Sequence, residues 1–418
     1  RMGGGGNDDG YLGEAEATNT LRCRRRQETF MFTFEDADGS VSTSGAAFPI
    51  NGTCGSYLRT ASGRRNGLCP TVLSLHGTGV SGQSQADSYK RKLKKRKGDQ
   101  FMFGVDGAWL VTPSRHGAHN WEHNGRRSAL AAMESLSGIV ESRFPSSVPS
   151  PDPYRVLFAG HSMGGHGAWI QLVHSPDRAI GGMPAAGWIR KESYGDSNNF
   201  MLLDVQLAQV SPYQKMVLES TVAENYVDTF VENLKGIPLY MRVGRNDRAV
   251  PPYYQRRIAR EIKDVVYSRR GEDGGKFVKM AEIAGKEHWW WDTTSENDGG
   301  TLNDKDMRKQ ISFMLQRSHA RFSSFLNAAT KGLGHPLPLG NSFRVVSFRS
   351  CAFESKGGLR VIQRAEYTAP GVIDVRLHGK AGTRHVEINT KNVIIFSVEA
   401  HPILLDMRNE DRERNAGN

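Results

Sequence analysis

The sequence predicts an α/β fold in which a mostly parallel sheet has helices on both faces. Short apolar runs of strand length recur between residues 71 and 283, and segments with helical spacing of apolar residues separate them. Strands that alternate with amphipathic helices build parallel sheets buried on both sides. After Gly340 the chain changes to short β-rich runs, which predicts a small β-rich module at the C-terminal side.

The elements are expected in the order strand, turn, helix. The strands of the α/β part are predicted at residues 30–34, 71–76, 108–112, 154–159, 238–243 and 277–283. Helices are predicted at residues 126–140, directly after the glycine-rich turn at 160–165, and at residues 304–326. The β-rich runs are residues 343–348, 359–363, 372–377, 384–388 and 393–398.

This pattern divides the chain into four parts. Residues 1–27 combine glycine and charge with few apolar side chains, so we expect them to be disordered. Residues 28–330 form the α/β domain, in which 181–236 is expected to be a cap inserted above the carboxyl ends of the strands. Residues 331–406 form the β-rich module, and 407–418 are a charged tail.

The charge and the cysteines limit the classes of partner. The net charge of +11 lies largely in two runs, 22–26 and 90–97, without any nucleic-acid-binding motif. We expect each run to be a solvated face or loop, with a nuclear-import signal or a contact with an anionic surface as the alternatives, and we expect no nucleic-acid partner. No apolar run is long enough to span a membrane and no signal peptide is visible, so a soluble chain is expected whose compartment and oligomeric state stay open. The four cysteines lack metal-ligand spacing, although Cys54 and Cys69 could form a disulfide in an exported protein.

The most informative motif surrounds Ser162. A predicted strand runs into Gly160-His-Ser162-Met-Gly164, and a predicted helix follows. A G-x-S-x-G turn in this context is the nucleophile elbow of the α/β-hydrolase fold, where the tight turn exposes the serine hydroxyl. Without a strand before it and a helix after it, the same motif would be an ordinary serine in a glycine turn.

A serine nucleophile needs a base and a group that orients the base, and in this fold they follow in the order serine, acid, histidine. Asp247 comes three residues after Gly244, which follows the predicted strand 238–243. His288 follows the predicted strand 277–283. Each lies at the carboxyl end of a strand, the edge where parallel sheets place their ligands. We therefore expect Ser162, Asp247 and His288 to form a catalytic triad.

The oxyanion of an acyl-transfer intermediate needs backbone donors, each contributing about 3 kcal/mol in the transition state. A strand ends in His76-Gly77-Thr78, and Met163 follows the nucleophile, so the N–H groups of Thr78 and Met163 are the expected pair. The side chains expected to line the substrate pocket are His76, His116, His119, Trp121, Trp188 and Trp289.

Two rival motifs point elsewhere. Residues 77–82 match G-x-G-x-x-G, and Asp106 stands at a distance that suits a ribose-binding acid, but the following segment is too polar for a dinucleotide-binding helix. Residues 119–123 match the zinc motif H-x-x-E-H, but the surrounding proline and glycines favour a loop over the helix that zinc binding requires. No metal and no cofactor are expected.

At these residues the chain resembles the prolyl-oligopeptidase-like serine peptidases, family S9, and their esterase neighbours. The resemblance covers residues 70–318 and rests on Leu75-His-Gly77, the run 113–122, the elbow 160–165, the acid loop 244–252 and Lys286-Glu-His288-Trp-Trp-Trp-Asp292. It implies a triad of Ser162, Asp247 and His288. Typical members carry a large β-propeller before this domain, and here about seventy residues precede it.

The expected function is that of a serine peptidase of the S9 type, which cleaves a peptide bond through an acyl-enzyme on Ser162. A carboxylesterase of the same fold is the alternative, so the substrate is a peptide or an ester. A binding protein that keeps the hydrolase scaffold without catalysis is the hypothesis from another class.

Overall fold

The structure is a computed structural model, and it describes most of the chain between residues 24 and 399. The described residues are 24–50, 54, 68–92, 101–115, 119–145, 147–190, 211–268, 271–272, 274–290, 300–331, 339–379 and 385–399. Within the last helix of the α/β part, side chains are described up to residue 318. The expectations for residues 1–23, His116, the basic residues 93–97 and the tail 407–418 lie outside this part of the chain.

Eight strands form one central sheet, in the order β1-β2-β6-β3-β7-β8-β9-β10. All run in the same direction except β2, which pairs antiparallel with both of its neighbours. The predicted, mostly parallel sheet is therefore confirmed. The strands are β1 (Phe30–Glu35), β2 (Val41–Ala47), β3 (Leu68–Leu75), β6 (Trp109–Pro113), β7 (Ser150–His161), β8 (Ala179–Ala185), β9 (Leu239–Gly244) and β10 (Val278–Ile283).

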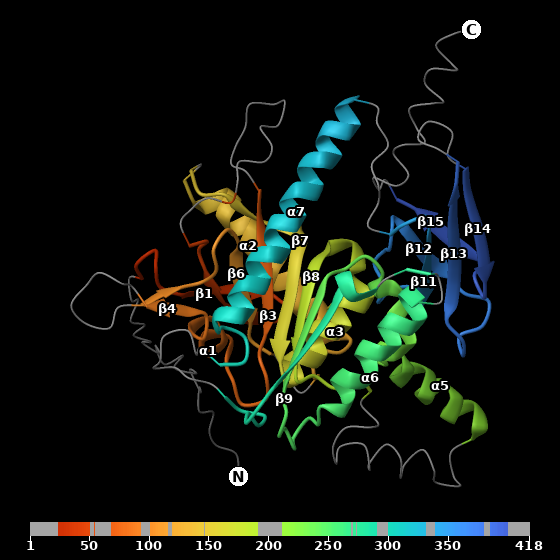
Figure 1. Cartoon of the computed structure of the whole chain (residues 1–418), viewed down its shortest axis with the longest axis horizontal. Coiled ribbons are helices and arrows are strands. Elements are labelled where there is room, and N and C mark those ends of the chain that lie inside the picture. The colour runs from red at the N-terminus through yellow and green to blue at the C-terminus, as the bar shows by residue number, and fades with distance from the viewer. Residues whose placement is uncertain are drawn as a thin grey trace, which may run out of the picture.

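Helices cover both faces of this sheet because neighbouring residues of its strands point to opposite sides. Leu73 belongs to the apolar cluster on one face and Val72 to the cluster on the other. The first face carries α2 (Asn124–Arg143), α3 (Met163–His174), α6 (Tyr253–Glu261) and the 3₁₀ segment η3 (Val227–Leu234). The second carries α1 (Gly82–Asp87) and α7 (Lys305–Lys331), the long helix that crosses the sheet in Figure 1.

Short elements connect these layers. They are β4 (Lys90–Lys92), β5 (Phe101–Phe103), η1 (Pro176–Arg178), α5 (Pro212–Ala223), η4 (Ile262–Tyr267) and η6 (Gly274–Lys276). Where the side chains of α7 are described, its apolar residues Met307, Ile311, Met314 and Leu315 are buried against the second face of the sheet.

The boundary expected for the cap is wrong. Residues 179–185 form β8, a central strand between β7 and β9, so an insertion cannot begin at residue 181. The small residues Gly181, Gly182 and Ala185 concealed this strand, because they lack the β-branched side chains by which strands are recognised. The region also supplies η3, whose Phe230 and Leu234 are buried in the main core. Residues 191–210 lie outside the described part of the chain.

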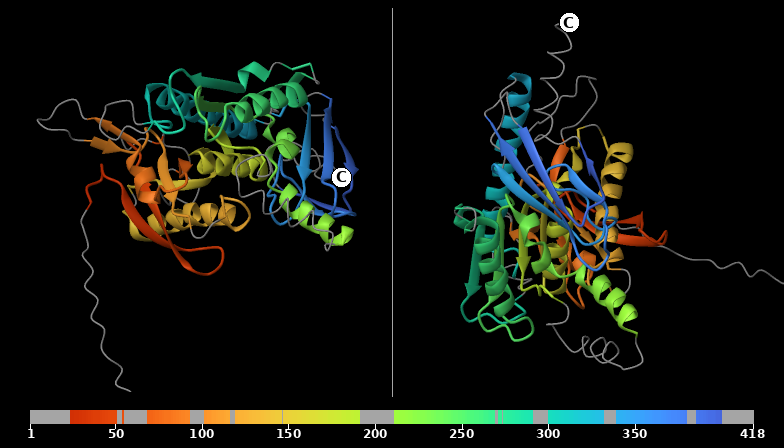
Figure 2. Two further views of the ribbon diagram at one scale, coloured as in Figure 1. Left: turned by 90° about the horizontal axis from the view of Figure 1, so that it is seen from below. Right: turned by 90° about the vertical axis from the view of Figure 1, so that its right-hand side faces the viewer.

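The C-terminal module consists of two small antiparallel sheets, as expected. One contains β11 (Ser342–Ser347), β13 (Gly371–His378) and β14 (His385–Lys391), and the other β12 (Leu359–Gln363) and β15 (Ile395–Val398). They enclose their own apolar core and stand beside η3 and α5 (Figures 1 and 2). Asn233 of η3 pairs with both the N–H and the carbonyl of Val346, at 2.9 and 2.8 Å, which fixes the module to the α/β domain.

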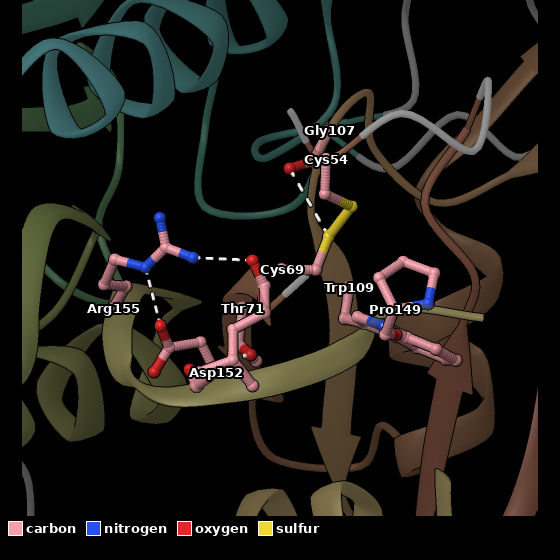
Figure 3. The surroundings of a disulfide bond; sticks show 9 residues. Cys54, Cys69, Thr71, Gly107, Trp109, Pro149, Asp152 and Arg155 are labelled. Carbon is pink, nitrogen blue, oxygen red and sulfur yellow. Dashed lines mark hydrogen bonds and ion pairs between the residues drawn. A yellow bond between two sulfur atoms is a disulfide. The ribbon is translucent and has the colours of Figure 1, made fainter. Parts of the chain in front are cut away.

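A disulfide fastens the amino end of β3. Cys54 bonds to Cys69, and both are buried, with their Cα atoms 5.2 Å apart. Figure 3 shows Arg155 beside this bond, where it donates to the carbonyl of Leu68 at 2.7 Å and to Asp152 at 2.6 Å. In the part of the chain that the structure describes, no helix is both long and apolar enough to cross a membrane.

Candidate active site

Ser162 lies at the sharp turn between β7 and α3. It has the positive φ of 60° and a ψ of −122°, a backbone conformation that L-amino acids rarely adopt. Turns of this kind store strain and are typical of functional sites. The turn confirms the strand, serine and helix expected from the motif.

The glycines of the elbow are required by the closeness of the backbones around it. A Cβ at position 160 would lie 2.0 Å from the carbonyl oxygen of Gly164, and one at position 164 would lie 1.9 Å from that of Leu75. These gaps are far shorter than any contact between non-bonded atoms. The sheet and α3 can therefore meet at Ser162 only without side chains at these two positions.

The structure brings the three predicted triad residues together. The Ser162 hydroxyl lies 2.8 Å from Nε2 of His288, and Nδ1–H of His288 donates to Oδ2 of Asp247 at 2.7 Å. The other carboxylate oxygen of Asp247 accepts the N–H of Val250 at 2.8 Å, which fixes the carboxylate after β9. All three residues are buried. The arrangement can move a proton from the hydroxyl to a histidine held in one tautomer.

A second imidazole supports this one. His161, directly before the nucleophile, is fully buried, and its Nε2 lies 2.9 Å from the backbone carbonyl of His288. Burial, aided by the neighbouring His288, lowers the pKa of His161 to about 3. The ring is therefore neutral, and its Nε2–H donates to the carbonyl.

The two residues expected to bind the oxyanion lie beside one another. Gly77 is against the nucleophile, since a Cβ there would be 3.2 Å from Cβ of Ser162. The next residue, Thr78, has its hydroxyl 3.9 Å from the sulfur of Met163. Met163 is the first residue of α3, whose N–H has no partner within the helix by geometry. The assignment of these N–H groups as donors stays a prediction.

The residues expected to line a pocket fall into two groups. Trp289 is half-exposed and has its ring edge-on to His288, with centroids 4.8 Å apart, so it is available to a substrate. His119 is partly buried. By contrast, Trp121 and Trp188 are buried in the main core and do not fit the expectation. Trp188 stacks on His166 with ring centroids 4.8 Å apart.

His76 has a structural position at the end of β3. Burial lowers its pKa, so the imidazole is neutral. Nδ1–H donates to the carbonyl of Gly77 at 2.9 Å, and Nε2 accepts the N–H of Arg115 at 3.0 Å. The side chain is therefore occupied in holding the turn that leads to Thr78.

The structure gives the two rival motifs other roles. Residues 119–123 form a loop, as expected, with positive φ at Asn120, Trp121 and His123. Glu122 contacts His166 of α3 at 3.0 Å, and among the described residues no three histidine, cysteine or acidic side chains cluster as metal ligands would. In the other motif, Gly82 begins the six-residue helix α1 and packs against the carbonyl of Thr112.

Two contacts of this site were not expected from the sequence: that of His161 with His288, and that of Glu122 with His166. The partners are 127 and 44 residues apart, and neither pair has a spacing that a motif would reveal. For the first contact the sequence offers one signal: the residue before the serine in G-x-S-x-G lies at the end of a strand, and this residue is His161.

Comparisons with known proteins give distant similarities. No family model matches the chain. An uncharacterised secreted protein of Arthroderma benhamiae is 25% identical over 397 residues, which cover 92% of this chain. The chain spans 36% of that protein's length.

Among solved structures, an S-formylglutathione hydrolase from Agrobacterium tumefaciens has a TM-score of 0.42 and 15% identity, with 69% of this chain and 95% of that one covered. An acylaminoacyl peptidase from Pyrococcus horikoshii has a TM-score of 0.41 and 14% identity, over 69% and 41%. A puromycin-hydrolysing peptidase from Mycobacterium tuberculosis has a TM-score of 0.42 and 17% identity, over 62% and 36%.

Proposed function

We propose that this chain is a serine hydrolase that transfers an acyl group to water through Ser162. The observation that carries the proposal is the unbroken relay from the hydroxyl of Ser162 to His288 and on to Asp247, at 2.8 and 2.7 Å. It lies on an α/β-hydrolase scaffold at a strained elbow. A buried relay of this kind serves to activate a hydroxyl at neutral pH.

The reaction proceeds in two halves. Oγ of Ser162 attacks the substrate carbonyl while Nε2 of His288 accepts the hydroxyl proton, and the imidazolium then gives this proton to the leaving group. Water attacks the acyl-enzyme in the same way and returns the free serine. Asp247 stabilises the imidazolium, and the N–H groups of Thr78 and Met163 bind the oxyanion in both halves.

For the substrate we propose a peptide bond, so that the enzyme is a peptidase of the S9 type. The support is the sequence resemblance over residues 70–318, in particular the elbow and the run from Lys286 to Asp292. A carboxylesterase uses the same relay and differs only in that the leaving group is an alcohol. The two functions are separated by the substrates that are turned over.

The first experiment is labelling with a fluorophosphonate probe, which forms a covalent bond with an activated serine. The wild type is expected to be labelled and Ser162→Ala is not. Ser142→Ala, on the exposed side of α2, is the matched control and should label like the wild type. A folded wild type without labelling would support the non-catalytic binding protein instead.

The second experiment is a comparison of kcat/KM for p-nitrophenyl esters and for peptide amides, including Xaa-Pro amides. Turnover of the amides that is lost in Ser162→Ala supports the peptidase. Turnover confined to the esters rejects the peptidase and leaves the carboxylesterase. In both cases the relay is the same, so the test concerns the leaving group alone.

We also propose that the chain works in an oxidising compartment. The buried disulfide Cys54–Cys69 is the observation behind this, because such bonds persist outside the cytosol. A gel-shift assay with a thiol-labelling reagent, applied to the native protein from its source, should show the Cys54–Cys69 bond formed. Fully reduced Cys54 and Cys69 in that sample would contradict the proposal.

A further inference from the structure

Trp121 contacts the turn after β3 that leads to the proposed oxyanion donor Thr78. The side chain is fully buried, and its indole N–H donates to the backbone carbonyl of His76 at 3.0 Å. It also fills the space beside α3, since a Cβ at Gly167 would lie 2.6 Å from Cβ of Trp121. Thr78, the first proposed oxyanion donor, is two residues after the carbonyl that the indole holds.

The neighbouring residue, Glu122, contacts α3, the helix that begins with the second proposed donor, Met163. The carboxylate of Glu122 lies 3.0 Å from Nε2 of His166, a fully buried residue of α3. His166 is three residues after Met163, the second proposed donor, and its other nitrogen contacts the carbonyl of Trp188 at 3.0 Å. Residues 121 and 122 therefore contact both elements that carry the oxyanion donors, the end of β3 and the start of α3.

The loop that presents these two side chains has an uncommon backbone. Asn120, Trp121 and His123 have φ values of 50°, 64° and 45°, all in the left-handed region that favours glycine. Such conformations cost free energy and persist where the surrounding contacts determine them. With this backbone the indole of Trp121 reaches the carbonyl of His76, and the carboxylate of Glu122 reaches His166.

From these contacts we infer that Trp121 and Glu122 are positioning residues that set the distance between the oxyanion donors of Thr78 and Met163. We call this pair the oxyanion clamp. The inference rests on the proposed function, because it assigns a role in the same reaction. The donors act on a developing charge, and a misplacement of about 1 Å is enough to lower a rate by about 100-fold.

The chain contains a matched control for Trp121. Trp109 is also fully buried, and its indole N–H donates to a backbone carbonyl, that of Pro149, at 2.8 Å. It begins β6, at the amino edge of the sheet near the disulfide (Figure 3), whereas Ser162 lies at the carboxyl edge. The two tryptophans thus have the same burial and the same kind of bond at opposite ends of the sheet.

The test compares Trp121→Phe with Trp109→Phe in the whole chain. Both variants lose one buried hydrogen bond and some packing, so their melting temperatures should fall by similar amounts. Only Trp121→Phe should lower kcat for a p-nitrophenyl ester, by roughly 10- to 100-fold at nearly unchanged KM. Inhibition by an aryl trifluoromethyl ketone, whose adduct carries an oxyanion, should weaken in proportion.

A kcat of Trp121→Phe within about twofold of that of Trp109→Phe would overturn the inference. If Trp121→Phe does not fold, Glu122→Ala decides in its place: the expected result is a loss of kcat and of ketone inhibition, and unchanged values reject the clamp. Failure of the proposed function is seen separately, as a wild type that neither labels with fluorophosphonate nor turns over the ester.

Discussion

The imidazole of His161 donates a hydrogen bond to the backbone carbonyl of His288, 2.9 Å away, and the two rings lie with centroids 4.8 Å apart. The residue before the proposed nucleophile therefore holds the loop of the proposed base. This contact spans 127 residues of sequence, and it ties the end of β7 to the loop after β10. We expect this contact to help set the distance of 2.8 Å between Oγ of Ser162 and Nε2 of His288.

We predict that His161→Leu lowers kcat by about 10-fold, because the loop of His288 loses its fixed distance to Ser162. His174→Leu is the control, since His174 is also a buried histidine that contacts a backbone carbonyl, that of Glu224, at 3.0 Å. The measurement is kcat of each variant relative to the wild type. Equal kcat values in the two variants would show that His161 contributes only to stability.

Asp247→Asn should reduce kcat by about 10,000-fold while leaving the fold intact. The amide presents its N–H to Nδ1 of His288 or leaves that position unpaired, so the tautomer that accepts the hydroxyl proton is lost. Ester turnover measures the loss of kcat, and circular dichroism shows whether the fold is intact. A kcat within tenfold of the wild type would show that the carboxylate does not orient the base.

Gly164→Ala should destabilise the protein by more than about 3 kcal/mol or prevent folding, because the new Cβ would lie 1.9 Å from the carbonyl oxygen of Leu75. Gly138→Ala is the opposite case. It lies inside α2 with open space around a Cβ, so the substitution should stabilise by about 1 kcal/mol. Urea unfolding of both variants measures the contrast.

The central sheet and the meeting of Ser162, Asp247 and His288 could be predicted because their signals are local. The apolar runs that became β3, β7 and β9 and the turn around Ser162 are each contained in about ten residues. Asp247 and His288 follow strands of one parallel sheet, and the carboxyl ends of such strands meet at one edge. The order of the chain was therefore enough to bring these residues together.

The position of β8 in the sheet and the burial of Trp121 depend on contacts between segments that are far apart in the sequence. β8 is made largely of small residues, so the sequence does not distinguish residues 181–185 from the expected cap. For Trp121 the sequence cannot decide, because an aromatic residue after a strand end suits either a pocket or the core. Its burial is decided by Gly167 of α3, which leaves room for the indole.

The disulfide should stabilise the protein by about 3 kcal/mol, the value expected when a bond closes a loop of about 15 residues in the unfolded chain. The double variant Cys54→Ser with Cys69→Ser is expected to lose this free energy in urea unfolding. Cys351→Ser is the control, because Cys351 is exposed and free. A loss below about 1 kcal/mol would contradict the expectation.

Acid should destabilise the protein through its buried histidines. Burial lowers the pKa of His174 to about 4 and that of His161 to about 3, both from an ordinary value near 6.5. Below pH 6.5 the unfolded chain therefore binds protons at these two imidazoles, while the folded chain keeps them neutral. The free energy of unfolding falls as the pH falls. Each group contributes about 1.4 kcal/mol per pH unit, down to about pH 4 for His174 and pH 3 for His161.

Urea unfolding at pH 7.5, 5.5 and 4.5 should show this slope, and His174→Gln should remove one group's share between pH 5.5 and 4.5. An identical slope in that variant would mean that His174 takes up its proton within the folded protein.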